Sequence, residues 1–336
     1  MHNYFFGINM NNWHTFLQLQ GASFLNDKEV SFGENLSAYS DSGKRQCFSP
    51  LTHLGALLVK GEDAKKFLQG QITCDIDNLS IRSSILGARC NPKGRTLVNF
   101  QLHEVKDNNF LLIMHHSLVA STKDELSKYA AFFKVSLLDV SEEYGILGVC
   151  LNNIKDEFKA PFSSSIYYYD DTRALIAVPV KKAEAQWFEL IDDYLPVGTV
   201  AWNLFDIQSG FVLLQKETSG AFIPQMLNMD HLDAISFTKG CYTGQEIIAR
   251  MKYLGTLKRK MHRVSRLNQE IPSIATEVYL PDAKQVVGTV VAAVQIDAVS
   301  QELLLVLNDK AVKSEWLVIG NSDMEKVIHL PLPYIK

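Results

Sequence analysis

The chain has 336 residues, of which 47% are hydrophobic and 21% are charged, a composition that is typical of globular proteins and excludes a disordered chain. Its length is enough for about two or three structural units with a large buried core. The formal net charge of −4 provides no overall basic field, so we expect no direct nucleic-acid binding, although a local basic patch is compatible with this total.

The N-terminal residues and the cysteines indicate the compartment. No lysine or arginine precedes the first apolar residues, which argues against a signal peptide. The longest apolar runs are far shorter than the roughly 20 residues that a membrane span needs. The five cysteines form no C-x-x-C pair, so we expect neither a disulfide framework nor a metal site. These features predict a cytoplasmic protein without membrane partners. The cysteines are Cys47, Cys74, Cys90, Cys150 and Cys241.

The N-terminal half predicts a helix and several strands. Residues 1–50 are polar and irregular, with a serine- and glycine-rich stretch at 37–43. The apolar run at 54–60 predicts a buried strand. Asp63 is expected to cap a helix that extends through about residue 69.

Hairpins dominate the next part of the chain. Residues 91–95 carry turn residues and join two predicted strands. Ser117 precedes a helical pattern of apolar residues that extends to 133. A second hairpin is predicted to turn at Asp170 and Asp171. The predicted strands in this region are 85–90, 96–103, 110–115, 135–140, 145–150, 166–169 and 174–180.

Two further helices precede a change of character. The first is predicted at 181–195, where Pro196 stops it, and the second at 201–210. After residue 259 only short strand-like runs follow, which predict a small antiparallel barrel or sandwich. We therefore predict an α+β fold with a boundary that separates residues 1–255 from residues 256–336. These runs are 277–280, 286–296, 303–307, 316–319 and 327–330, with Val264 before them.

One segment, residues 237–250, carries the strongest chemical signal. Two glycines flank Cys241, Tyr242 and Thr243, and an apolar helical pattern follows. The positive end of that helix and the ammonium of Lys239 both favour a thiolate at Cys241, so we select Cys241 and Lys239 as the reactive residues. The alternative is a small buried cysteine packed beside a turn.

The order of several short blocks resembles the YgfZ family, which is related to the glycine-cleavage T-protein. The most specific block is K-G-C-Y-T-G-Q-E at 239–246. The other blocks are F-L-Q-G-Q-I-T-C-D at 67–75, N-P-K-G-R at 91–95, F-I-P-Q-M-L-N at 222–228, Y-L-G at 253–255 and K-R at 258–259.

This resemblance implies a fold and a role. The fold would be that of the T-protein: a folate-binding α+β region of two intertwined subdomains, with a folate site in a central opening, and a C-terminal β-barrel. The role would be to bind tetrahydrofolate or a derivative and to support the assembly or repair of iron–sulfur proteins, including tRNA-modifying enzymes. Folate and these client proteins would be its partners, and contact with a cluster would be transient.

The resemblance also suggests ligand-binding residues. Trp202 matches a tryptophan that contacts folate in this family, and the alternative is a core tryptophan. Leu54 takes the place of a second folate-contacting aromatic residue. Lys93 and Arg95 could attract the glutamate tail of folate, or form a solvated hairpin tip. The residues assigned to the cofactor are Trp202, Leu54, Tyr242, Gln245, Glu246 and Arg95.

Aminomethyl transfer is the enzymatic alternative within this resemblance. The T-protein uses an aspartate beside the folate, whereas Val98 and Asn99 occupy the matching segment and carry no acid. A second alternative is an enzyme with Cys241 as nucleophile, for which His231 and His262 are the nearest histidines along the chain. We expect no conventional turnover. We also expect His115 and His116 to point to opposite faces of a strand, which disfavours a shared metal.

Overall fold

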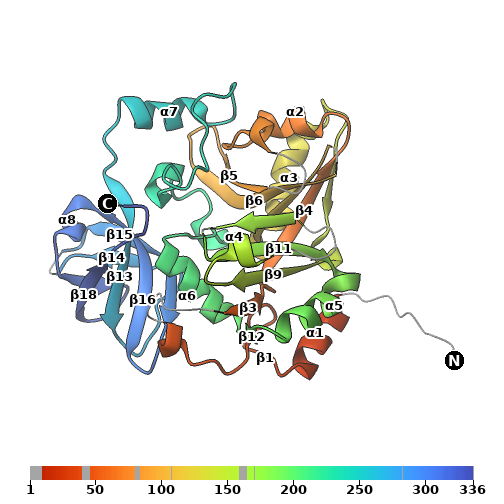
Figure 1. Cartoon of the computed structure of the whole chain (residues 1–336). Helices are drawn as coiled ribbons and strands as arrows, with labels where there is room; N and C mark the ends of the chain where they lie inside the picture. Colours follow the sequence, from red (N-terminus) through yellow and green to blue (C-terminus); the bar gives the residue numbers. More distant parts are fainter. Residues whose placement is uncertain are drawn as a thin grey trace.

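The computed structural model describes residues 10–39, 46–79, 84–106, 108–158, 165–169, 171–281 and 283–335. Two five-stranded sheets and a closed barrel form its framework (Figure 1). No helix in the described part of the chain is long and apolar enough to cross a membrane. Asp170 of the predicted second turn, and residues 40–43 of the serine- and glycine-rich stretch, lie outside the described residues.

The first sheet is built from two separate parts of the chain. Strand β3 precedes the strands of the second sheet in the sequence, whereas the other strands of the first sheet follow them. The two parts join where β3 pairs antiparallel with β9. Only the short contact of β12 with β3 is parallel. In spatial order the strands are β10 (Ser165–Tyr168), β11 (Arg173–Pro179), β9 (Tyr144–Cys150), β3 (Cys47–Pro50) and β12 (Leu195–Pro196).

The second sheet is antiparallel throughout. Its first strand in the sequence coincides with the predicted strand at 54–60, and the hairpin predicted around 91–95 joins its first two strands in space. The order is β5 (Ser84–Cys90), β6 (Thr96–Lys106), β7 (Asn109–His115), β4 (Leu54–Lys60) and β8 (Ser136–Asp139). A two-stranded sheet of β1 (Ser23–Phe24) and β2 (Val30–Ser31) lies outside both.

The helices are α1 (Met10–Leu19), α2 (Ala64–Gln69), α3 (Val119–Ala130), α4 (Ile154–Glu157), α5 (Val180–Ile191), α6 (Thr199–Ser209), α7 (Gln245–Tyr253) and α8 (Asp309–Val312). Helix α3 packs against the second sheet, α5 packs against the first sheet, and α6 packs against the barrel. The helix predicted at 181–195 ends at Ile191, five residues before Pro196. Asp63 occupies the N-cap position of α2 as predicted, but its side chain makes no capping hydrogen bond. Its carboxylate instead accepts a hydrogen bond from the Lys134 amide at 2.9 Å.

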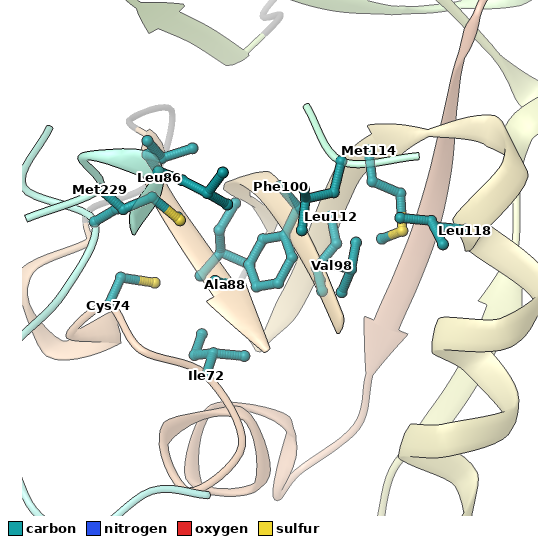
Figure 2. Close-up of a cluster of buried hydrophobic side chains, with 14 of the residues drawn as sticks. Ile72, Cys74, Leu86, Ala88, Val98, Phe100, Leu112, Met114, Leu118 and Met229 are labelled. Carbon is teal, nitrogen blue, oxygen red and sulfur yellow. The ribbon is translucent and has the colours of Figure 1, made fainter. Parts of the chain in front are cut away.

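Apolar packing joins these layers into one body. Figure 2 shows a cluster of buried apolar side chains on the second sheet, with Phe100 and Leu112 at its centre and Cys74 at its edge. Another cluster brings Ala56 and Ile113 of the second sheet against Leu175 of the first sheet. The two sheets therefore face each other across a shared apolar layer that includes residues of α6.

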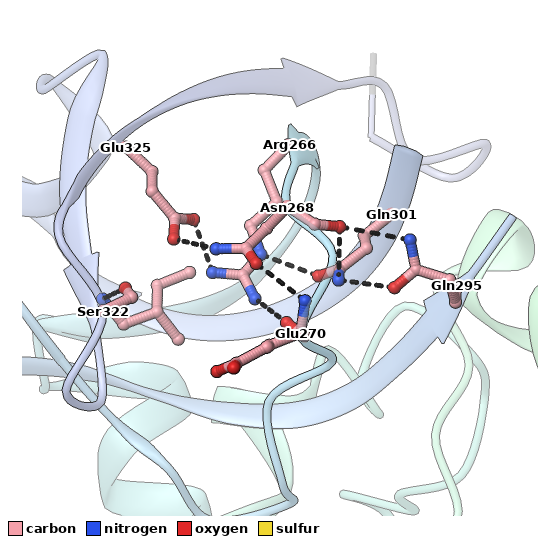
Figure 3. Close-up of polar contacts among 8 residues, drawn as sticks. Arg266, Asn268, Glu270, Gln295, Gln301, Ser322 and Glu325 are labelled. Carbon is pink, nitrogen blue, oxygen red and sulfur yellow. Dashed lines mark hydrogen bonds and ion pairs between the residues drawn. The ribbon is translucent and has the colours of Figure 1, made fainter. Parts of the chain in front are cut away.

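The predicted barrel is confirmed as a closed six-stranded antiparallel barrel. At one end, Arg266 donates hydrogen bonds to Gln301 at 2.8 Å and to the Glu270 carbonyl at 2.9 Å, and it pairs with Glu325 (Figure 3). The predicted boundary at residue 255 falls between α7 and the first barrel strand. The strands in spatial order are β13 (Arg259–Leu267), β16 (Ser300–Asn308), β15 (Val286–Gln295), β14 (Glu277–Tyr279), β17 (Trp316–Ile319) and β18 (Met324–Leu330).

Candidate functional site

Three sequence blocks meet in one place, which we call the motif junction: residues 67–75, 91–95 and 239–246. Lys239 connects the first and third blocks. Its ammonium donates hydrogen bonds to the carbonyls of Gln69, Ile72 and Cys74 at 2.8, 2.9 and 2.7 Å. The Thr243 amide adds a bond to the Gly70 carbonyl at 3.2 Å. The loop that follows α2 is thereby fixed against the cysteine-bearing segment.

The surroundings of Lys239 differ from those that the sequence alone suggests. Its ammonium points toward residues 69–74 and lies 5.0 Å from the centre of the Tyr242 ring. Burial lowers the pKa of Lys239 to about 8. A lysine with these contacts holds the loop in place, and its assignment as a reactive residue stays a prediction.

Two glycines bring the hairpin of the motif junction against the start of α7. Gly94 has φ +68° and Gly244 has φ +86°, a backbone conformation that glycine adopts readily. A Cβ at Gly244 would lie 2.7 Å from the Asn91 carbonyl oxygen. The hairpin and α7 therefore approach each other more closely than side chains would permit.

Cys241 is exposed beside this contact, whereas the other four cysteines are buried. It lines a cavity of about 540 Å³ in front of α7. The predicted residues Tyr242, Gln245 and Glu246 line the same cavity, together with Pro92. The structure therefore brings Cys241 and the three residues that were assigned to the cofactor together on one surface.

The individual contacts of these residues are mainly structural. Tyr242 is only 6% exposed, while the Glu246 carboxylate accepts a hydrogen bond from Arg250 at 2.9 Å. The predicted residue Arg95 donates to the Ala221 carbonyl at 2.7 Å and Lys93 is exposed at the hairpin tip. Their assignment to a cofactor stays a prediction.

A second cavity, of about 270 Å³, lies between α6 and the barrel. We call it the α6–barrel pocket. Its volume is near the lower end of the roughly 300–1,000 Å³ that is typical for small-molecule sites. Apolar residues form much of its wall, and polar side chains interrupt it. The apolar lining includes Ile207, Phe211, Ile271, Pro272, Ile274 and Val291, and the polar lining includes Glu29, His53, His115, Asn203, Asp206 and Gln215.

One ion pair stands in the wall of this pocket. The Arg173 guanidinium donates to a carboxylate oxygen of Asp206 at 2.9 Å, and the two side chains are 2% and 12% exposed. The guanidinium carbon lies 5.0 Å from the centre of the Tyr169 ring and 5.6 Å from that of Trp202. Arg173 thus links a core aromatic pair to a carboxylate at the pocket.

Trp202 itself lies in the core. It is 1% exposed, and a Cβ at Gly148 would come within 2.5 Å of its ring. Leu54 is buried in the same cluster. Neither residue lines the α6–barrel pocket, so in this conformation the ring of Trp202 supports Arg173. Direct folate contacts by Trp202 and Leu54 stay predictions.

Histidines gather at one edge of the pocket. The ring centres of His53 and His115 are 6.1 Å apart, and those of His115 and His116 are 4.7 Å apart. The expectation that His115 and His116 point to opposite faces is wrong, because β7 ends at His115 and a 3-10 turn begins at His116. Burial lowers the pKa of His53 to about 3 and that of His115 to about 4. Both rings are therefore neutral near pH 7.

No group of three or more histidine, cysteine or carboxylate side chains is placed to hold a metal within the described ranges. At the segment that matches the T-protein's acid, Val98 is 1% exposed and Asn99 is 2% exposed. The Asn99 amide donates to the Val212 carbonyl at 2.7 Å and accepts from the Leu214 amide at 2.8 Å. Asn99 therefore fixes the chain that follows α6.

Sequence reasoning missed most of the α6–barrel pocket. Asp206 lies four residues after Trp202 on the same helix, which is the one local signal that could have suggested it. The proximity of His53 and His115 depends on the pairing of β4 with β7, which no local sequence pattern indicates.

Comparison with known proteins agrees with this fold. Residues 48–150 match the GCVT N-terminal domain family. The glycine cleavage system aminomethyltransferase T from Bartonella henselae has a TM-score of 0.70 over 96% of this chain and 97% of that chain, at 14% sequence identity. At that identity the similarity shows a shared fold and does not show a shared activity.

Sequence relatives define the family. The tRNA-modifying protein YgfZ from Colwellia psychrerythraea is 34% identical over 241 residues, which are 66% of this chain and 73% of that protein. The protein of the same name from Hamiltonella defensa is 32% identical over 81% of this chain and 86% of its own length. An uncharacterized protein from Haemophilus influenzae is 32% identical over 84% of this chain and 97% of its own length. The chain therefore belongs to the YgfZ family, and it has the fold of the glycine-cleavage T-protein.

Proposed function

We propose that this protein binds a reduced folate in the α6–barrel pocket and supports tRNA modification by maintaining iron–sulfur proteins through Cys241. The tRNA part of this proposal rests on the name of its relatives, which are called tRNA-modifying proteins. The folate part rests on the pocket. The iron–sulfur part rests on the family resemblance and on the exposed thiol.

The pocket is the observation that carries the proposal. Four parts of the chain line it: Glu29, the end of β7, helix α6 and the barrel. Apolar walls with a few polar groups suit a flat heterocycle that must be oriented. Its volume of about 270 Å³ suits the pterin of a folate, whose glutamate tail would extend toward solvent.

Cys241 stands apart from this pocket. The two cavities share no lining residue, so a client protein could reach the thiol while a folate is bound. One cysteine cannot by itself hold a four-cysteine cluster. Cys241 would therefore contact iron or a cluster transiently, or exchange with a cysteine-bound persulfide or disulfide on the client.

Calorimetry tests the folate part. We expect tetrahydrofolate to bind with a Kd of about 1 µM, about 8 kcal/mol. Asn203→Trp should fill the pocket from α6 and weaken binding at least tenfold, whereas Cys241→Ser should leave the affinity unchanged. Absence of tetrahydrofolate binding to the unmodified protein would refute this part.

Complementation tests the Cys241 part. In cells that lack the native gene, Cys241→Ser protein should fail to restore iron–sulfur enzyme activity and the tRNA modifications that depend on it. The same variant should retain folate binding. Full restoration by Cys241→Ser would show that the thiol is dispensable.

A further inference from the structure

Asp206 places a carboxylate in a mainly apolar wall of the α6–barrel pocket. One of its oxygens accepts a hydrogen bond from Arg173, and its side chain, which lines the pocket, is 12% exposed. A buried carboxylate is tolerated only when a partner compensates its lost hydration. Arg173 provides this partner and stabilises the charged form at the pocket surface.

The guanidinium of Arg173 is fixed from behind. It is buried over the rings of Tyr169 and Trp202, an arrangement in which the cation is attracted by the aromatic faces. Gly148 leaves the space in which the Trp202 ring lies. Trp202 is therefore a positioning residue, which acts on the pocket through Arg173 and Asp206.

The chemistry of the pocket indicates which ligand edge meets this carboxylate. An ionised carboxylate accepts hydrogen bonds and donates none, and two parallel N–H donors match its two oxygens best. Near it, Ile207 and Phe211 of the pocket wall offer apolar contact. A flat ring with two adjacent N–H groups at one edge meets both requirements. The 2-amino-4-oxopyrimidine edge of a pterin has this form, and so does the corresponding edge of guanine.

We propose that Asp206, held by Arg173, binds the 2-amino-4-oxopyrimidine edge of the ligand in the α6–barrel pocket. This inference rests on the proposed folate function and extends it by naming the residue that orients the ring. It assigns Asp206 to direct contact, and Arg173 and Trp202 to positioning.

The test compares one variant with one matched control by calorimetry. Asp206→Asn should weaken tetrahydrofolate binding at least tenfold, because the side chain loses its charge and one acceptor. Glu302→Gln breaks another buried ion pair, with Arg263 at 2.7 Å, outside the pocket lining. It should leave the affinity unchanged even if it costs similar stability.

A modified ligand separates direct contact from a folding effect. A tetrahydrofolate analogue with a methyl group in place of the 2-amino group should bind the unmodified protein at least tenfold more weakly than tetrahydrofolate. In Asp206→Asn the same replacement should change the affinity less than threefold, because the interacting pair is already broken. Equal losses in both proteins would overturn the assignment.

Further measurements distinguish the ligand sources and the two proposals. Guanosine binding that is lost in Asp206→Asn would support the contact but identify a nucleoside as ligand. Tetrahydrofolate binding that is unchanged in Asp206→Asn would overturn the contact and leave the folate function standing. Absence of binding by every ligand with this edge would remove both proposals.

The positioning role of Trp202 has its own readout. Trp202→Phe keeps an aromatic face for Arg173, whereas Trp202→Leu does not. The tenfold preference for the 2-amino ligand over its methyl analogue should persist in Trp202→Phe and decrease in Trp202→Leu. An equal preference in both variants would exclude action through Arg173.

Discussion

The ammonium of Lys239 donates hydrogen bonds to the backbone carbonyls of Gln69, Ile72 and Cys74. No other side chain among the described residues donates to these three oxygens. Replacing Lys239 with Met would leave the carbonyls of Ile72 and Cys74 without these hydrogen bonds, and an unmet buried polar group costs about 1–3 kcal/mol. We therefore expect a lower urea midpoint with an unchanged slope. Lys252→Met is the control, since Lys252 is exposed and should change stability by less than about 0.5 kcal/mol. Equal midpoints for the two variants would contradict this role.

Cysteine accessibility gives a second residue-level prediction. Burial raises the pKa of Cys74 and of Cys90 to about 12, while Cys241 is exposed. Because the thiolate is the reactive form, iodoacetamide should alkylate Cys241 well before the other cysteines of the folded protein. Peptide mass mapping over time measures this order, and denatured protein, in which every cysteine reacts, is the control. Comparable rates at Cys90 and Cys241 would refute it.

At the scale of elements, the contact between the hairpin and α7 depends on glycine. Gly244→Ala would force a side chain into a positive-φ position and against Asn91, so we expect a loss of about 1–3 kcal/mol. Gly240→Ala in the same block is the matched control, because a Cβ added there would meet no atom of the described residues within 4 Å beyond its own chain neighbours. Thermal melting of both variants measures the difference. A Gly244→Ala protein as stable as Gly240→Ala would show that the hairpin can move away.

At the scale of the whole molecule, we expect the free energy of unfolding to decrease in acid. Burial lowers the pKa of His53 and His103 to about 3, and that of His115 and His262 to about 4. In the unfolded chain these groups take up protons near pH 6.5. Below that pH the unfolded state binds more protons, so the free energy of unfolding decreases as the pH falls from about 6.5 toward 3. Urea midpoints at pH 7.5 and pH 5 measure this loss.

His103 isolates one contribution to this effect. It is fully buried, and neither ring nitrogen has a hydrogen-bond partner within the described ranges. His103→Leu should therefore reduce the difference in stability between pH 7.5 and pH 5. His231→Gln is the control, because His231 is exposed and should leave the difference nearly unchanged. A His103→Leu protein with the original pH dependence would assign the acid sensitivity to other groups.

The sequence by itself determined the local elements. Alternating and continuous apolar runs predicted β4, both hairpins and the barrel strands. A strand that is buried on one face shows alternating apolar residues, and a strand that is buried on both faces shows a continuous apolar run. Glycines at 240 and 244 indicated the turn before α7, and Gly244 has the positive φ that few other residues adopt. The family blocks identified the T-protein fold.

Only the tertiary structure decided which side chains of different elements contact each other. Lys239 meets Gln69, which lies 170 residues earlier, and Asp206 meets Arg173 across 33 residues. No local periodicity encodes such pairs, because they depend on which sheets and helices finally pack together. The same packing buries Trp202 and leaves the α6–barrel pocket one helical turn away, where the carboxylate of Asp206, and not the indole ring, lines the cavity.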